Sequence, residues 1–450
     1  MRIAIDNSDN VYEFNELKIF KDYNSLINKT IESMTQKERL LNAKSMIMID
    51  KNTGKIIFEF NMIHAQHFYP LSILDYAKSL QALISKRIPS LPILSLDSHD
   101  YGSCDFNCKD CLAVETREWA RKNLNFTLFD PEHYEKVLTE ISRYSKERGC
   151  DSVRLEMSGE GNPDMYPHRA RIIKYAAEKC NMKIVYVSSG SRLDEETIDA
   201  LAKYAYYIRI SFPGINESSY KKYSNQKTTN DKEFGFHDAL KLIEKLVEKR
   251  KQYNREGELV IGARTCIRKE NEGDYFNTAK RLKNAGADCF QIVKILIPIG
   301  ENIGDYGLSK STVEELSQIH SSQNEFGKMS IQIPQKLDYM YYDRKIEESL
   351  KPSKCYSSFV SPILYGPYLV ICTHWKKIKD LNESYYGFVS GEKNQLETLM
   401  HNEKALKNRR QVPEKCEDCC SIYDNLLMEM IRSQLALVKD VSDVEFLLTY

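Results

Sequence analysis

The sequence predicts a mixed α/β protein whose main part is a partial TIM-like barrel of six β/α units. Two observations support this prediction. Between residues 91 and 300, short apolar stretches alternate with amphipathic helical patterns, as expected when helices cover a parallel sheet. There are six such units, fewer than the eight of a closed (β/α)8 barrel. An α+β appendage is expected before the barrel and a further unit after it.

The barrel elements follow from apolar runs bounded by turn residues. The expected strands are 92–97, 152–157, 183–188, 207–211, 259–267 and 289–297, and the expected helices are 131–146, 169–179, 194–205, 237–250 and 274–284.

The faces of the strands predict what fills the barrel. In the strand 152–157, Val153, Leu155 and Met157 alternate with Arg154, Glu156 and Ser158. Helices need the apolar face, so the polar faces are expected to point inward; these also carry Arg209, Ser211, Arg264 and Cys266. Charged side chains are costly to bury without partners. We therefore expect a wet or ligand-filled cavity, with buried ion pairs that brace the barrel as the alternative.

The flanking regions have their own patterns. Residues 1–90 predict an accessory α+β unit with a helical stretch at 22–41, a hairpin that turns at 52–54 and a second helix at 71–87. Residues 301–349 predict a linker with connecting helices, and residues 350–450 a C-terminal unit with a helix at its end.

Charge and cysteine content limit the function classes. Lys plus Arg and Asp plus Glu number 64 each, which gives no reason to expect a nucleic acid or an anionic membrane as partner. The N-terminus lacks a signal-peptide pattern and no run of 18 apolar residues occurs, so a cytoplasmic protein is expected. Twelve cysteines are too few for a disulfide scaffold of 450 residues, and clustered thiols in the cytosol favour metal ligands or catalytic groups.

One loop gathers three cysteines in the order C-x3-C-x2-C. Cys104, Cys108 and Cys111 follow the first strand directly, which places them at the C-terminal mouth of the barrel, where active sites lie. Three thiolates can hold three corners of a 4Fe-4S cluster and leave the fourth iron open. Zinc would instead need a fourth protein ligand or water.

This motif, in a loop after the first strand of a partial barrel, resembles the signature of the radical S-adenosylmethionine (radical SAM) enzymes, over roughly residues 92–300. The resemblance implies that the open iron binds the amino and carboxylate groups of SAM. It also implies that one-electron reduction cleaves SAM to methionine and a 5'-deoxyadenosyl radical.

Further segments resemble the cofactor-binding motifs of that family. The stretch "SGEGNPDMYP" (158–167) is similar to the glycine-rich turn that holds the SAM amino group, with Asn162 where glutamate is usual. The oxygen of Asn162 could still accept a hydrogen bond from the ammonium group. Asp110 stands where an aromatic residue is common, and Phe106 is the candidate to supply that ring. The resemblance implies cofactor contacts at Phe106, Gly159, Glu160, Gly161, Asn162, Ser189, Ser211 and Arg264.

The C-terminal cysteines resemble a SPASM/twitch extension, over about residues 350–424. That resemblance implies one auxiliary 4Fe-4S cluster held by Cys355, Cys372, Cys416 and Cys419, with Cys420 either replacing Cys419 or free. A structural zinc site with the same four thiolates is the alternative.

The family implies removal of a hydrogen atom from a substrate carbon by an enzyme of oxidoreductase or isomerase type, fed by a flavodoxin- or ferredoxin-type electron donor. The expected setting is peptide (RiPP-type) maturation or natural-product tailoring, with a peptide or small-molecule substrate. The alternative is an epimerase, dehydrogenase or dehydratase acting on an aminocyclitol, sugar or nucleoside. A more distant alternative is a zinc-binding interaction protein without activity. Glu156 and Arg209 are candidate catalytic residues, and Cys266 is a candidate hydrogen donor or else a core residue.

Overall fold

The structure is a computed structural model of the 450-residue chain. It describes residues 2–4, 11–13, 45–52, 56–61, 70–85, 90–108, 111, 113–124, 126–159, 161–226, 233–268, 271–295, 307–334, 355–370, 385–403, 405–407, 422–438 and 440–449. The helix expected at 22–41 lies outside the described residues. No described helix has the length and apolar character needed to cross a membrane.

A parallel sheet forms the centre of the molecule, and its strands pair in the order in which they occur in the sequence. All six expected barrel strands are present, with bounds that differ by a few residues. They are β5 (Ser95–His99), β6 (Arg154–Met157), β7 (Lys183–Ser188), β8 (Ala205–Phe212), β9 (Val260–Cys266) and β10 (Cys289–Val293). The predicted partial barrel is therefore confirmed.

A seventh parallel strand, β11 (Ser330–Gln332), extends the barrel beyond β10. It lies in the region where the sequence predicted a linker with connecting helices, after α11 (Lys310–Ser321) and the 3-10 turn η5 (Gln323–Phe326). Three residues are too few to display the alternation that identifies a strand in a sequence.

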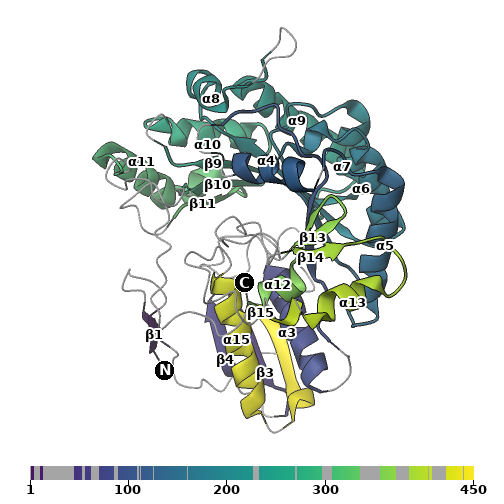
Figure 1. The fold of residues 1–450 in the computed structure, drawn as a ribbon. Coiled ribbons are helices and arrows are strands. Elements are labelled where there is room, and N and C mark those ends of the chain that lie inside the picture. The colour runs from purple at the N-terminus through teal and green to yellow at the C-terminus, as the bar shows by residue number, and fades with distance from the viewer. Residues whose placement is uncertain are drawn as a thin grey trace.

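Helices cover the outer side of the curved sheet (Figure 1). The five expected helices are confirmed, and α4, α8 and α11 are additional. The ranges are α4 (Val114–Asn123), α5 (Pro131–Lys146), α6 (Arg169–Glu178), α7 (Glu195–Tyr204), α8 (Glu217–Ser224), α9 (Phe236–Gln252) and α10 (Tyr275–Asn284). Polar side chains define where several begin: Asp130 accepts a hydrogen bond from the His133 amide at 2.8 Å, and Asp194 accepts one from the Thr197 amide at 2.8 Å.

The two faces of the sheet differ as the sequence predicted. Leu155, Met157, Ile208 and Ile210 are buried in the main core between strands and helices. The residues that alternate with them face the barrel interior. Part of this interior is apolar, because a second cluster of buried residues lies on the inner face of the strands. We call this cluster the barrel floor; it comprises Val185, Val187, Tyr206, Tyr207, Val260 and Cys289.

A second, three-stranded sheet joins the two ends of the chain. The expected hairpin is present as β3 (Ser45–Asp50) and β4 (Ile56–Asn61), and β15 (Val444–Thr449) pairs antiparallel with β3. Helices α3 (Pro70–Ile84) and α15 (Ile422–Leu437) lie beside this sheet (Figure 1). Buried residues from both ends of the chain pack in one cluster, among them Met46, Met48, Tyr76, Ile431, Leu435 and Phe446. The accessory unit therefore includes C-terminal residues as well as residues before position 90. The 3-10 turn η8 (Val441–Asp443) precedes β15, and a separate pair, β1 (Arg2–Ala4) and β2 (Val11–Glu13), is also antiparallel.

The C-terminal extension continues the barrel sheet on its other edge. β12 (Ile363–Tyr365) pairs in parallel with β5 and turns at Gly366 into β13 (Tyr368–Val370), which pairs with β14 (Tyr385–Phe388). Gly366 has φ +53, and a Cβ there would lie 2.8 Å or less from the Phe126 ring. Helices α12 (Ser357–Val360) and α13 (Gln395–His401) flank these strands. β12 and β13 thus form a hairpin that follows Cys355 within the region that resembles a SPASM/twitch extension.

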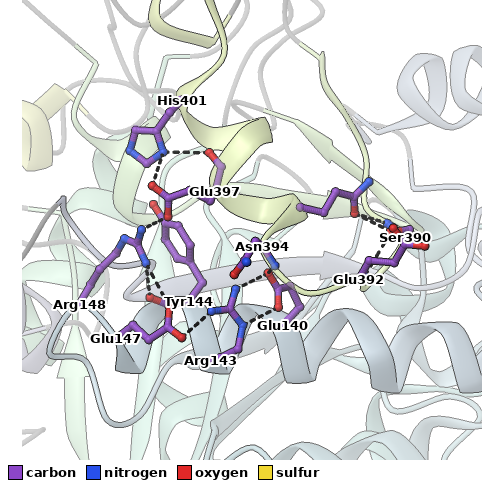
Figure 2. A network of polar contacts seen from close by, with 11 residues as sticks. Glu140, Arg143, Tyr144, Glu147, Arg148, Ser390, Glu392, Asn394, Glu397 and His401 are labelled. Carbon is purple, nitrogen blue, oxygen red and sulfur yellow. Dashed lines mark hydrogen bonds and ion pairs between the residues drawn. The ribbon is translucent and has the colours of Figure 1, made fainter.

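Polar contacts fix this extension to helix α5 of the barrel (Figure 2). The buried Glu140 accepts hydrogen bonds from Arg143 Nη2 at 2.6 Å and from the Asn394 amide at 3.0 Å. Arg148 pairs with Glu397 and lies 3.7 Å above the Tyr144 ring. The extension is therefore joined to the barrel by a hydrogen bond to the buried Glu140 and by an ion pair whose carboxylate, Glu397, is half-exposed.

Candidate active site at the barrel mouth

The cysteine loop follows β5 and borders a cavity of about 430 Å³. The walls come from this loop, from the turn after β6 and from the ends of β7, β8 and β9. The predicted site residues that line it are Cys104, Phe106, Cys108, Cys111, Glu156, Gly159, Gly161, Asn162, Ser189, Arg209, Ser211, Arg264 and Cys266. Glu160 lies outside the described residues. The structure thus brings the remaining barrel candidates together at one place, while the role of each residue stays a prediction.

The three cysteines are partly buried and lie close to one another along the loop. The Cys111 amide donates to the Cys108 carbonyl at 3.1 Å, and Arg117 Nη1 lies 3.7 Å from Cys111 Sγ. Burial raises the pKa of Cys104 to about 11 and that of Cys108 to about 12, and neighbouring thiols contribute to both shifts. Without a metal, these two thiols are protonated at neutral pH.

This donor set fits an iron-sulfur cluster, because thiolates are its usual protein ligands and metal binding displaces thiol protons. Within the described part of the chain, no three His, Cys, Asp or Glu side chains converge as they would on one metal ion. In a cubane cluster each thiolate instead binds a different iron.

A buried carboxylate anchors the cysteine loop. Asp105 accepts hydrogen bonds from Asn162 Nδ2 at 2.8 Å, Ser191 Oγ at 2.9 Å, Arg192 Nε at 3.1 Å and Gln226 Nε2 at 3.3 Å. These donors belong to the turn after β6, the turn after β7 and the segment after α8. One side chain of the loop therefore contacts three other segments at the mouth.

The glycine-rich turn after β6 packs directly against the backbone of the cysteine loop. A Cβ on Gly161 would lie 2.8 Å from the Tyr101 carbonyl oxygen and closer still to that of Ser103. The Asn162 amide donates to the Ser103 carbonyl at 3.1 Å. Only a residue without a side chain allows this close approach at position 161.

The Asn162 side chain is already engaged in the turn. Its Nδ2 also donates to Ser191 Oγ at 2.9 Å, and its Oδ1 accepts from the Asp164 amide at 3.2 Å, which caps the 3-10 turn η2 (Pro163–Met165). The oxygen that the sequence suggested for the SAM ammonium group thus has an acceptor role within the fold.

Two arginines of the cavity wall were not singled out from the sequence. Arg268 donates to the Pro213 carbonyl at 2.8 Å, and its guanidinium lies 3.5 Å from the centre of the Tyr223 ring. The period of two that placed Arg264 and Cys266 on one face would have found Arg268 if extended past the strand. Arg117 lies on α4. The sequence of this helix is so polar that it was not recognised as a helix from the sequence.

Of the auxiliary-cluster ligands expected from the sequence, Cys355 is described. It is buried, and its carbonyl accepts a hydrogen bond from Ser358 Oγ at 2.7 Å. The other candidates, Cys372, Cys416, Cys419 and Cys420, lie outside the described residues. The auxiliary cluster stays a prediction.

Comparison with known proteins agrees with the site. Residues 100–282, from the segment just after β5 into α10, match the sequence model of the radical SAM superfamily. The chain carries a radical SAM domain. This confirms the family expected from the cysteine loop and supports an enzyme.

Solved structures share the fold of this chain. Streptococcus suis SuiB is 14% identical with a TM-score of 0.50, and the match covers 77% of each chain. SuiB bound to its precursor peptide SuiA is 16% identical with a TM-score of 0.50, covering 77% of this chain and 75% of that one. Native anSMEcpe with AdoMet and the Cp18Cys peptide is 14% identical with a TM-score of 0.45, covering 75% and 88%. No match was found among curated protein sequences.

Proposed function

We propose that the chain is a radical SAM enzyme that removes a hydrogen atom from a carbon of a peptide during peptide maturation. The observation that supports this most is the single cavity that joins the three cysteines to the glycine-rich turn and to the polar ends of β8 and β9. Cys104, Cys108 and Cys111 would hold a 4Fe-4S cluster. When bound and reduced, the cluster and SAM supply the 5'-deoxyadenosyl radical.

The residues of the chain position the reactants. Gly159 and Gly161 border the cavity, and the close packing of Gly161 on the cysteine loop holds the turn beside the proposed cofactor site. Ser189 and Ser211 offer hydroxyl groups, and Arg264 offers a cation, to the polar parts of SAM. Phe106 borders the cavity as an apolar wall. The barrel floor excludes water from the lower end of the cavity, which protects a radical from side reactions.

A peptide substrate has support from the accessory unit. SuiB, which shares the fold, has been solved with its precursor peptide. In the three-stranded sheet of this chain, β4 and β15 each pair with β3 alone among the described strands. An extended peptide can add to such an edge through backbone hydrogen bonds.

A second candidate is epimerisation or dehydrogenation of an aminocyclitol, sugar or nucleoside. The polar inner face, with Glu156 and Arg209, favours it because such substrates need hydrogen-bonding partners. Cys266 borders the cavity and would be the hydrogen donor of an epimerase. Replacement of Cys266 by serine separates the outcomes, since only epimerisation would be lost while substrate radical formation continued.

The reaction requires an electron donor and an electron acceptor, and we propose both. An auxiliary 4Fe-4S cluster on Cys355, Cys372, Cys416 and Cys419 would accept an electron from a substrate radical, and a flavodoxin or ferredoxin in the cytoplasm would reduce the barrel cluster. Measurement of iron and zinc distinguishes an enzyme with two clusters from a structural zinc protein. Two cubane clusters require about eight irons per chain.

The proposed function is tested by anaerobic reconstitution, reduction with dithionite and measurement of 5'-deoxyadenosine. Wild type should form it from SAM, whereas Cys108→Ala should not. Cys150→Ala is the matched control, because Cys150 is a partly buried thiol outside the cavity and its loss should leave the reaction intact. Wild-type protein with both clusters intact that forms no 5'-deoxyadenosine would refute the proposal.

A further inference from the structure

Arg209 occupies a distinct level inside the barrel. It lies on β8 beside Val187 of β7 and Gly262 of β9 in the strand register. Ser211, two residues further along β8, shares its face and lies about 7 Å nearer the mouth. Arg209 is therefore deeper than the residues proposed to contact SAM.

Toward the base of the barrel, the surroundings of Arg209 on its own strand and on the two adjacent strands are apolar. Val185, Tyr207 and Val260 form the next row down and are at most 2% exposed, and the same row continues to Glu156 on β6. The space beside Gly262 is filled, since a Cβ there would lie 2.5 Å from Cys289 Sγ and 3.2 Å from the Tyr207 ring. The guanidinium thus stands between a closed apolar floor and the open part of the cavity.

Arg209 differs from the other cavity arginines in having no partner among the described residues. Its Nε is buried and has no hydrogen-bond acceptor there, and it forms no ion pair within the described ranges. Arg117 and Arg268 contact Cys111 and the Pro213 carbonyl, and Arg264 has interactions of its own. A guanidinium in an apolar setting is costly unless an anion pairs with it.

The charge of the cavity wall also favours an anionic ligand. The described lining residues include four arginines, Arg117, Arg209, Arg264 and Arg268, but a single carboxylate, Glu156. Glu156 lies on β6, and β7 separates that strand from β8. Among the described lining residues, positive charge therefore exceeds negative charge.

We propose that Arg209 binds a carboxylate of the substrate and so selects substrates with an acidic group near the reacting carbon. The planar guanidinium can donate two parallel hydrogen bonds to the two oxygens of a carboxylate, a geometry that a neutral amide does not satisfy. The proposal rests on the proposed function, in which a peptide segment enters this cavity. For a peptide, the group is the side chain of an aspartate or glutamate residue or the C-terminal carboxylate.

SAM also carries a carboxylate that Arg209 could bind. The following experiment distinguishes binding of the SAM carboxylate from binding of a substrate carboxylate. Reconstituted holoenzyme is titrated calorimetrically with SAM alone, and then, in the presence of SAM, with two acetylated and amidated tripeptides, Ala-Glu-Ala and Ala-Gln-Ala. These probes differ only in charge. The variants are Arg209→Gln and Arg209→Lys, with Arg171→Gln as control because it removes an arginine from a surface ion pair on α6.

The proposal predicts that wild type and the Arg171 control prefer the glutamate peptide by about tenfold or more, as expected for charge-assisted hydrogen bonds. The preference should disappear in Arg209→Gln and return in part in Arg209→Lys, while SAM affinity changes little in any variant. Equal binding of the two peptides by wild type would overturn the proposal, and so would an Arg209→Gln protein that keeps the preference but binds SAM about tenfold more weakly. Failure of the proposed function would instead appear as absence of 5'-deoxyadenosine, which these binding measurements do not involve.

Discussion

Asp105 shows how one residue can hold a cofactor loop in place. Its carboxylate is 4% exposed and accepts hydrogen bonds from four side chains on three segments. In Asp105→Asn, one oxygen becomes an NH2 group that faces donors, so at least one buried donor loses its acceptor. We expect a loss of about 1–3 kcal/mol in the free energy of unfolding and faster loss of iron from the reconstituted protein.

Iron retention after gel filtration and urea denaturation measure this effect, with Asp151→Asn as an exposed control. If Asp105→Asn holds iron as firmly as wild type does, the carboxylate is not what positions the cysteine loop.

Asp100, just before the loop, gives the metal-free protein a pH dependence. Burial raises the pKa of its carboxyl from 3.8 to about 6, against hydrogen bonds from Ser98 and Tyr134 that lower it. A raised carboxyl pKa favours folding while the group is protonated, so its contribution is complete below pH 3.8 and is lost as the pH rises through about 6. The shift corresponds to about 3 kcal/mol at pH 7.5.

Asp100→Asn keeps the neutral form at every pH. Relative to wild type, the variant should therefore gain about 2 kcal/mol of stability between pH 4.5 and pH 7.5, because part of the shift is already titrated at pH 4.5. Urea denaturation of both proteins at the two pH values checks this. A stability difference that does not change with pH would mean that Asp100 has an ordinary pKa.

At the scale of elements, a hydrogen bond to the buried Glu140 of α5 joins the C-terminal extension to the barrel. Glu140 is 3% exposed, and its removal leaves the Asn394 amide without this acceptor and Arg143 with Glu147 alone. Glu140→Ala should lower the free energy of unfolding by about 3 kcal/mol. It should also increase hydrogen exchange in residues 394–401, because the start of α13 loses one of its contacts with the barrel while the Arg148–Glu397 ion pair remains.

Glu147→Ala, at the C-cap of the same helix, is the matched control. Glu147 also pairs with Arg143 but is 52% exposed, so its loss should cost about 1 kcal/mol or less. Similar exchange rates in α13 for the two variants would show that Glu140 does not fix the extension.

The elements that could be predicted from the sequence are those whose pattern repeats over several residues. Val153, Leu155 and Met157 alternate with polar residues, and the structure places them in the core as expected. The pairing of β15 with β3 could not be predicted, because it joins residues almost 400 positions apart and leaves no local pattern. For the same reason, Asp105 was missed as the loop anchor: its four donors come from distant segments.

At the scale of the molecule, the extension and the two-ended accessory unit both contact the first barrel strand or the residue just before it. β12 adds the extension to the same sheet as β5, the strand that leads into the loop. Leu94, just before β5, and Val360, just before β12, pack into the core of the accessory unit. A substrate bound at that unit would thus be held by a body that packs directly against the first barrel strand.

The central claim is that the barrel cluster has an open iron that binds SAM. The most direct measurement is electron paramagnetic resonance of the reduced Cys416→Ala/Cys419→Ala double variant, in which the proposed auxiliary ligands are removed. We predict about four irons per chain and a reduced-cluster signal that changes when SAM is added. A zinc-containing protein without a signal, or a signal that SAM leaves unchanged, would contradict the account.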